Sequence, residues 1–175
     1  MRRLTYAIVV AGAVLCADTS TAIISCDPTA TDCLPPPTTT GTIDCSGATL
    51  QPGVIWPPDH KMVAVNVVGV TTSDPLYGPV QITINSIYQD EPVNALGSGN
   101  TAPDGSGVNT STAWVRAERA GPGTGRIYFI TFTAMDQSGN YCGPITLTAN
   151  VPHDQGQGFT PVYTGQKYDS TMVPP

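Results

Sequence analysis

The sequence carries little charge. Lysine and arginine together number 7 among 175 residues, aspartate and glutamate number 13, and the formal net charge is −6. Proteins that bind nucleic acid neutralise phosphates with clustered basic side chains, which this composition cannot supply. The chain also lacks a basic amphipathic stretch of the kind that lies on a membrane surface. We therefore expect partners other than nucleic acid or lipid.

Long apolar segments are missing as well. The apolar run Tyr6–Cys16 is about 11 residues, which is too short to span a bilayer. It follows two arginines and is followed by small residues, so residues 1–22 are expected to be a signal peptide cleaved after Ala22. The mature chain would then be secreted or displayed at the cell surface, with no membrane span. A lipoprotein anchored through Cys16 is less favoured, because Leu15 is not the small residue expected before a lipidated cysteine.

Cysteine is scarce, and no C-x-x-C pair occurs. Signal cleavage removes one of the five and leaves Cys26, Cys33, Cys45 and Cys142. An even number in an exported chain predicts two disulfides, and the irregular spacing disfavours a zinc site. Four cysteines allow three pairings, of which we favour Cys26–Cys33 as a local loop and Cys45–Cys142 as a long-range link.

Motifs for catalysis are also absent. The chain has two histidines, His60 and His153, and no G-x-S-x-G sequence that would position a nucleophile. We expect no enzyme, and interpret both histidines as structural. A small secreted hydrolase or metalloenzyme stays open as an alternative, with the two histidines on copper or zinc, or with Glu91 and Glu118 as a glycosidase pair.

Threonine, valine and turn residues dominate what remains, with 18 glycines and 17 prolines. No long segment has a helical apolar period, whereas short segments alternate as strands do. The expected strands are 42–50, 61–70, 80–89, 112–119, 126–135 and 143–151, with one short crossing strand within 90–111. This pattern predicts an all-β fold, an immunoglobulin-like antiparallel β-sandwich of about seven strands; a closed barrel is the runner-up.

The sandwich should occupy residues 42–156. Residues 126–135 are apolar on both faces and should form a central strand. Residues 23–41 are rich in Thr, Pro and Asp, and are expected to be an arm that carries a small disulfide loop. Residues 157–175 are expected to be a flexible tail or a loosely docked extra strand.

Several short motifs follow one another in a fixed order. They are W-P-P-D-H-K at 56–61, D-E-P-V-N-A-L-G at 90–97, T-A-P-D at 101–104, R-A-E-R-A-G at 116–121, G-R-I-Y at 125–128, D-Q-S-G-N at 136–140 and V-P-H-D-Q-G at 151–156. Together they resemble a bacterial extracellular Ig-like module, similar to the HYR and other Ig-like repeats of surface proteins. The resemblance covers roughly 42–156. It implies an architecture and an extracellular compartment, with an envelope protein or polysaccharide as partner, and no single reaction. Ser98 and Asn100 stand where that family commonly has acidic residues.

Sandwich topology should bring four polar segments to one end of the fold, which we call the polar pole. These segments are 56–61, 90–91, 116–119 and 153–154. Its expected members are Trp56, Asp59, His60, Lys61, Asp90, Glu91, Arg116, Glu118, Arg119, His153 and Asp154. We favour a network in which arginines pair with carboxylates and Trp56 covers the network. These four segments meet at one end only if residues 90–111 contain one strand.

Calcium is the alternative reading of the polar pole, since Ca²⁺ takes six to eight oxygen ligands. Glu91, Glu118 and Asp154 occupy places similar to the calcium ligands of cadherin-like sandwiches, and Asp90 and Asp59 could add to them. The neighbouring Lys and Arg speak against this reading. A second candidate is the loop 94–104, in which Asp104 is the one acid. We expect no other cofactor.

Overall fold

The computed structural model describes residues 14–16, 24–26, 41–73, 79–94, 96–154 and 160–174. The chain divides into two compact units, Met1–Thr40 and Gly41–Pro175. In the first unit, β1 (Val14–Cys16) pairs antiparallel with β2 (Ile24–Cys26). The expected cleavage site and Cys33 lie outside the described residues, so the signal peptide and the Cys26–Cys33 bond stay predictions.

The second unit contains two four-stranded sheets. One has the order β4 (Thr49–Gln51), β5 (Met62–Val68), β9 (Thr112–Arg116) and β8 (Gly105–Ser106). The other has the order β11 (Tyr141–Pro152), β10 (Gly125–Met135), β7 (Gln81–Gln89) and β12 (Tyr168–Asp169). A short pair, β3 (Ile43–Asp44) with β6 (Thr71–Thr72), stands beside them.

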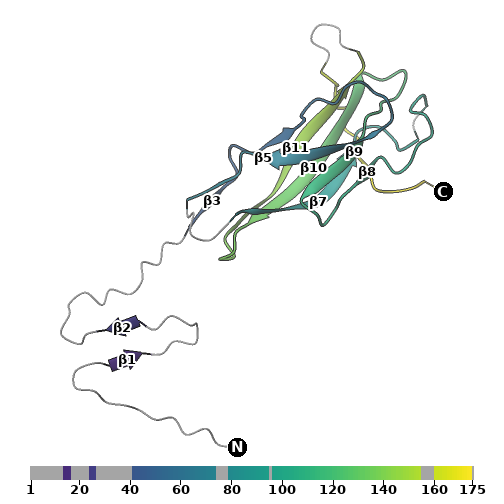
Figure 1. The fold of residues 1–175 in the computed structure, drawn as a ribbon. Helices are drawn as coiled ribbons and strands as arrows, with labels where there is room; N and C mark the ends of the chain where they lie inside the picture. Colours follow the sequence, from purple (N-terminus) through teal and green to yellow (C-terminus); the bar gives the residue numbers. More distant parts are fainter. Residues whose placement is uncertain are drawn as a thin grey trace, which may run out of the picture. The chain divides into compact units, whose positions relative to one another are not determined.

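Strand neighbours within these sheets are antiparallel, and in Figure 1 the long green strands β10 and β11 run side by side. Side chains from both sheets share one core, in which Val65 and Val115 are buried with Ile84, Ile130 and Phe132. The expected all-β, antiparallel architecture is therefore confirmed. The described ranges contain no helix long and apolar enough to cross a membrane.

The predicted central strand is also confirmed, because β10 lies between β11 and β7. Its inward residues Tyr128, Ile130 and Phe132 are fully buried, while Phe129 on the outward face is partly exposed. The strand pattern of the sequence thus placed this element correctly. Arg126 shares the inward alternation, which matters for the site described below.

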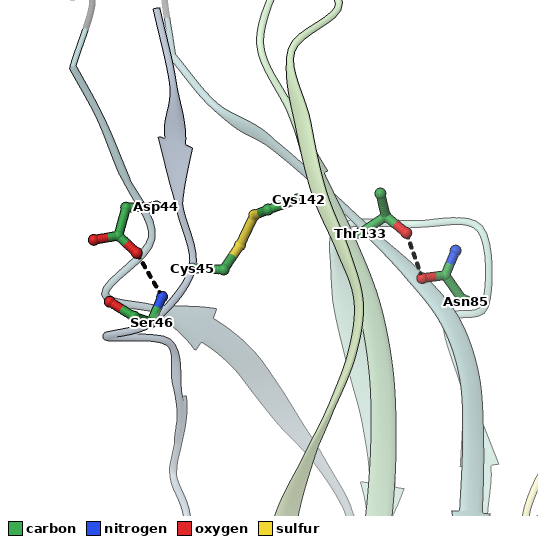
Figure 2. Close-up of a disulfide and its surroundings, with 6 residues drawn as sticks. All are labelled: Asp44, Cys45, Ser46, Asn85, Thr133 and Cys142. Atoms are coloured by element: carbon green, nitrogen blue, oxygen red, sulfur yellow. Dashed lines mark hydrogen bonds between the residues drawn. A yellow bond between two sulfur atoms is a disulfide. The ribbon is translucent and has the colours of Figure 1, made fainter.

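Strand β7 departs from the clean alternation expected over 80–89. Its register against β10 shifts between Ile84 and Ser86, which leaves Asn85 as an extra residue. A bulge of this kind changes which side chains face the core. Ile84 is buried before the bulge, and Ile87 and Gln89 are buried after it. Asn85 accepts a hydrogen bond from the Thr133 hydroxyl instead (Figure 2).

A disulfide joins Cys45 to Cys142, as expected, over a sequence separation of 97 and a Cα–Cα distance of 6.3 Å. Figure 2 shows the bond connecting the segment after β3 with the beginning of β11. Beside it, the Asp44 carboxylate accepts a hydrogen bond from the Ser46 N–H at 2.8 Å, which turns the chain towards β4. The link therefore ties the first part of the sandwich to its last long strand.

The tight turn expected at 136–140 connects β10 to β11. Asp136 N–H donates to the Asn140 carbonyl at 3.0 Å, and Gly139 has φ 84°, a conformation that favours glycine. The Asn140 side chain donates to Asp136 at 2.9 Å and holds the pKa of that carboxyl below its usual value. This turn keeps the two longest strands in register.

Within residues 160–174 the C-terminal segment contributes a short extra strand, which is one of the two alternatives expected for the tail. Strand β12 pairs with the end of β7. Ser170 N–H donates to the Ile87 carbonyl at 3.0 Å, and the Ser170 carbonyl accepts from the N–H groups of Asp104 and Gly105 at 2.9 and 2.7 Å. Because Ser170 contacts both β7 and β8, it closes the gap between the two sheets along one edge.

Candidate functional site

The structure joins the four segments of the polar pole through direct contacts. His60 Nδ1 lies 3.2 Å from Glu118 Oε2. The Ala120 N–H donates to Glu91 Oε2 at 2.7 Å, and Arg119 Nε donates to the His153 carbonyl at 3.2 Å. The crossing strand on which the topology argument depended is β8.

Arg126 is the centre of the polar pole, and the sequence reasoning missed it. Its side chain is 0% exposed. Nε lies 3.0 Å from Glu91 Oε2, and Nη1 lies 2.8 Å from Asp104 Oδ2 and 3.2 Å from Glu118 Oε1. One guanidinium thus connects carboxylates from three separate segments of the chain.

Three further side chains surround this contact and complete what we call the buried ionic cluster. Its members are Gln89, Glu91, Asp104, Arg116, Glu118, Arg126 and Tyr128. Gln89 donates to Asp104 Oδ2 at 2.8 Å, and the bulge in β7 is what turns Gln89 inward. The Tyr128 hydroxyl accepts from Arg126 at 3.2 Å and donates to the Arg116 carbonyl at 2.8 Å.

Arg116 connects the buried ionic cluster to the surrounding loops. Its Nε lies 3.5 Å from Asp104 Oδ1 and 3.9 Å from Glu118 Oε2. Its two terminal nitrogens donate to the carbonyls of His60 at 2.9 Å and Pro103 at 2.7 Å. The residue therefore orients loop backbone as well as balancing charge, which a planar guanidinium does better than an ammonium.

Charge in the buried ionic cluster is only partly balanced, because three carboxylates face two guanidiniums. Burial raises the pKa of Asp104, although Arg126 and Gln89 favour its ionised form. Burial also raises the pKa of neighbouring Asp90, whose Oδ1 accepts the Ile127 N–H at 2.8 Å. Burial disfavours the charged form of Arg126, but Tyr128 and Asp104 outweigh it and raise the pKa of this guanidinium. Arg126 therefore carries its positive charge at neutral pH.

The stretch Val54–Lys61 enters the polar pole through its backbone. His60 has φ 64°, an uncommon value for a residue with a side chain. Three contacts hold it there: its N–H donates to the Ala117 carbonyl at 2.9 Å, its carbonyl accepts from Arg116, and its ring faces Glu118. The Thr101 hydroxyl also donates to the Glu118 carboxylate. The structure thus assigns His60 a partner within the network.

Trp56 lies partly at the surface, and its expected role as a cover of the network stays a prediction. Its side chain is 39% exposed, whereas the preceding Ile55 is 2% exposed and belongs to the core. The Ile55 N–H donates to the Asn150 carbonyl at 2.8 Å, which directs Ile55 inward and its neighbour outward. Asp59 and Lys61 form an ion pair at the surface, and the Lys61 side chain lowers the pKa of the Asp59 carboxyl.

The expected calcium ligands are engaged in other interactions. Glu91 and Glu118 face Arg126, and Asp90 accepts a backbone N–H. Asp59 pairs with Lys61, and Asp154 Oδ2 lies 3.4 Å from His153. Among the residues that the structure describes, no three His, Cys, Asp or Glu side chains form a group that could hold a metal ion. Arg126 supplies the positive charge that Glu91 and Glu118 face, so these contacts favour the arginine–carboxylate network over the calcium site. The same holds for Asp104 in the second candidate loop.

The histidines occupy different surroundings. His153 Nε2 lies 3.2 Å from the Gly121 carbonyl oxygen and Nδ1 lies 3.4 Å from Asp154, so both ring nitrogens face oxygen atoms. His60 Nδ1 faces Glu118. A metal ion needs a nitrogen lone pair directed towards it, and the contacts of the two rings have no partner in common.

Two signals in the sequence could have identified the centre of the cluster. Arg126 lies an even number of residues before Tyr128, Ile130 and Phe132, so strand alternation places it on the inward face. Asp104 directly precedes β8, at the end of a turn-rich stretch. The bulge that turns Gln89 inward has no comparable signature.

Comparisons with models of protein families, with curated proteins and with solved structures find no match for this chain. Its role must therefore be argued from its own side chains and their surroundings.

Proposed function

We propose that this chain is an exported, Ig-like β-sandwich that acts as a non-catalytic structural or binding module at a bacterial cell surface. The observation that carries the proposal is the state of its acid and base groups. Glu91, Asp104 and Glu118 all face Arg126 in a buried cluster. Groups held this way specify packing, whereas a general acid or base must reach a substrate.

The strand order supports the Ig-like part of the proposal. The strands compared with an immunoglobulin domain are the seven that build the two main sheets without the short edge strand β12, namely β4, β5, β7, β8, β9, β10 and β11. In chain order, one sheet is first-second-fifth-fourth and the other is seventh-sixth-third. This agrees with the ABED and GFC sheets of constant-type immunoglobulin domains. Such an order places the loops at the two ends of the sandwich, and the polar pole is at one of these ends.

The covalent link supports export. Disulfides persist in oxidising compartments and are rare in reducing ones. Cys45 and Cys142 form a bond in this fold, and the N-terminal sequence has the pattern of a signal peptide. Both features fit a protein that folds after leaving the cytoplasm.

Fractionation of a bacterial host that produces the full chain tests the proposal. The expected product is found outside the cytoplasm, begins at Ile23 by mass spectrometry and carries an oxidised Cys45–Cys142 pair. A full-length chain that stays in the cytoplasm with free thiols would refute export. Hydrolysis of a substrate that is lost in Glu118→Gln, while the variant stays folded, would refute the non-catalytic role.

A further inference from the structure

Trp114 lies on the outward face of the sheet β4-β5-β9-β8. Its neighbours along β9, Ala113 and Val115, are both fully buried, so alternation directs Trp114 away from the core. Its side chain is 43% exposed. A large indole in the middle of a sheet, on the solvent side, contributes nothing to the core described above.

The residues directly opposite the Trp114 indole on the two neighbouring strands are small. In the register of the sheet, Trp114 is directly opposite Ala64 on β5 and Ser106 on β8. Side chains opposite each other in an antiparallel pair are the closest cross-strand neighbours. Both neighbours here are small, which fits the 43% exposure of the Trp114 side chain.

The next row of the same face is polar and uncharged. Thr112 is opposite Asn66, its hydroxyl donates to Asn66 Oδ1 at 3.0 Å, and Gln51 on β4 follows on the far side of Asn66. On the other side of Trp114 comes Arg116, whose guanidinium is turned away to the carbonyls of His60 and Pro103. The row beside the indole therefore offers hydroxyl and amide groups.

We infer that this face binds a neutral polysaccharide, with one sugar ring stacked on the Trp114 indole. A pyranose has an apolar face of C–H groups and a rim of hydroxyls. An exposed indole offers the matching apolar plane, and hydroxyl and amide side chains both donate and accept hydrogen bonds. The inference rests on the proposed role as a binding module and names its ligand class.

Other occupants match this face less well. A protein partner or a second copy buries about 800 Å² on each side, more than half of it apolar, whereas the large apolar side chains of this sheet that are more than a third exposed are Trp114 and Val68. Nucleic acid and anionic lipid need basic groups, and the net charge of the chain is −6. A neutral sugar needs neither a large apolar area nor charge.

The test uses the mature chain and a panel of neutral polysaccharides: insoluble cellulose and chitin in depletion assays, and soluble β-1,3-glucan and dextran by fluorescence titration. The chain has two tryptophans, and Trp56 is 39% exposed. Trp56→Ala is therefore a matched control for Trp114→Ala. We expect binding to at least one polymer, a loss of at least tenfold in Trp114→Ala, and a change under twofold in Trp56→Ala.

A second variant separates stacking from folding. Trp114→Phe keeps an aromatic plane and should retain part of the affinity, and all variants should melt within a few degrees of the parent because the position is exposed. Absence of binding across the panel, or equal binding by Trp114→Ala and the parent, would overturn the inference. An exported, disulfide-bonded chain that binds no saccharide would refute this inference alone, while failure of export would refute the proposed function itself.

Discussion

Arg126→Met should be one of the most destabilising single substitutions in this fold. Methionine nearly fills the volume but leaves three carboxylates without their shared guanidinium, two of them on side chains that are 0% exposed. Removing one partner of a buried ion pair costs about 3–5 kcal/mol. Arg116 stays 3.5 Å from Asp104 and 3.9 Å from Glu118, so we expect a value near the lower end. For a domain of this size, that loss lowers Tm by roughly 10–15 °C.

Urea unfolding at pH 7, followed by tryptophan fluorescence and circular dichroism, measures the loss. Arg119→Met is the matched control and should cost about 1 kcal/mol, because within the described part of the chain Arg119 donates to the carbonyls of His153 and Ala120. A second arm repeats both measurements at about pH 4. The carboxylates abandoned by Arg126 become easier to protonate, so the difference between Arg126→Met and the parent should shrink as the pH falls.

Two results would refute this reasoning. Equal losses in Arg126→Met and Arg119→Met would mean that the buried contacts contribute no more than surface hydrogen bonds. A loss that is the same at pH 4 and pH 7 would mean that unpaired, buried carboxylate charge is not its cause.

The remaining predictions concern the covalent link, the core boundary and two acids. Cys45→Ser should lower the free energy of unfolding by about 4–5 kcal/mol through loop entropy, and an equal stability with and without a reductant would contradict it. Ile55→Ala should cost about 2–4 kcal/mol as a core truncation, while Trp56→Ala should cost under about 1 kcal/mol; the reverse order in a thermal melt would place the wrong residue in the core. Burial raises the pKa of Asp90. Protonated Asp90 therefore makes its full contribution to the free energy of unfolding below about pH 3.9, and this contribution is lost as the pH rises through the pKa of Asp90 in the folded state. The free energy of unfolding of Asp90→Asn should therefore rise relative to that of the parent between about pH 4 and pH 7. The pKa of Asp136 is lowered by hydrogen bonds in its turn, so its contribution is present above about pH 3.9 and is lost on acidification. Asp136→Asn should be less stable than the parent at pH 7 and should approach the stability of the parent near pH 3. Thermal melts in which Asp90→Asn and Asp136→Asn follow the same pH trend relative to the parent would contradict these two predictions.

Most of the fold could be predicted from the alternation of apolar and polar residues along the strands. The pattern of 126–135 identified β10 as central, and the pairing of Cys45 with Cys142 followed from the expected places of the first and last strands. The alternation within each strand is a local signal that is repeated over several residues. They agree with the packing because the core of a sandwich is built from alternate residues of both sheets.

The composition of the polar pole was harder to predict than its location. Gln89 faces inward only because Asn85 interrupts the ladder between β7 and β10, and a bulge has no fixed sequence pattern. Trp56 was expected to cover the network, but it is 39% exposed, and the neighbour that enters the core is Ile55, whose N–H is bonded to β11. In both places, one backbone contact outweighed the side-chain pattern.

The Cys45–Cys142 bond also determines how this domain would respond to a pulling force. The sequence separation between the two residues is 97, and an extended chain gains about 3.4 Å per residue. While the bond is intact, roughly 330 Å of chain between the cysteines cannot lengthen under tension. Only the segments outside the bond can be drawn out, and the strands that build most of the core lie within it. Reduction of this single bond would convert a short, stiff element into a long, extensible one.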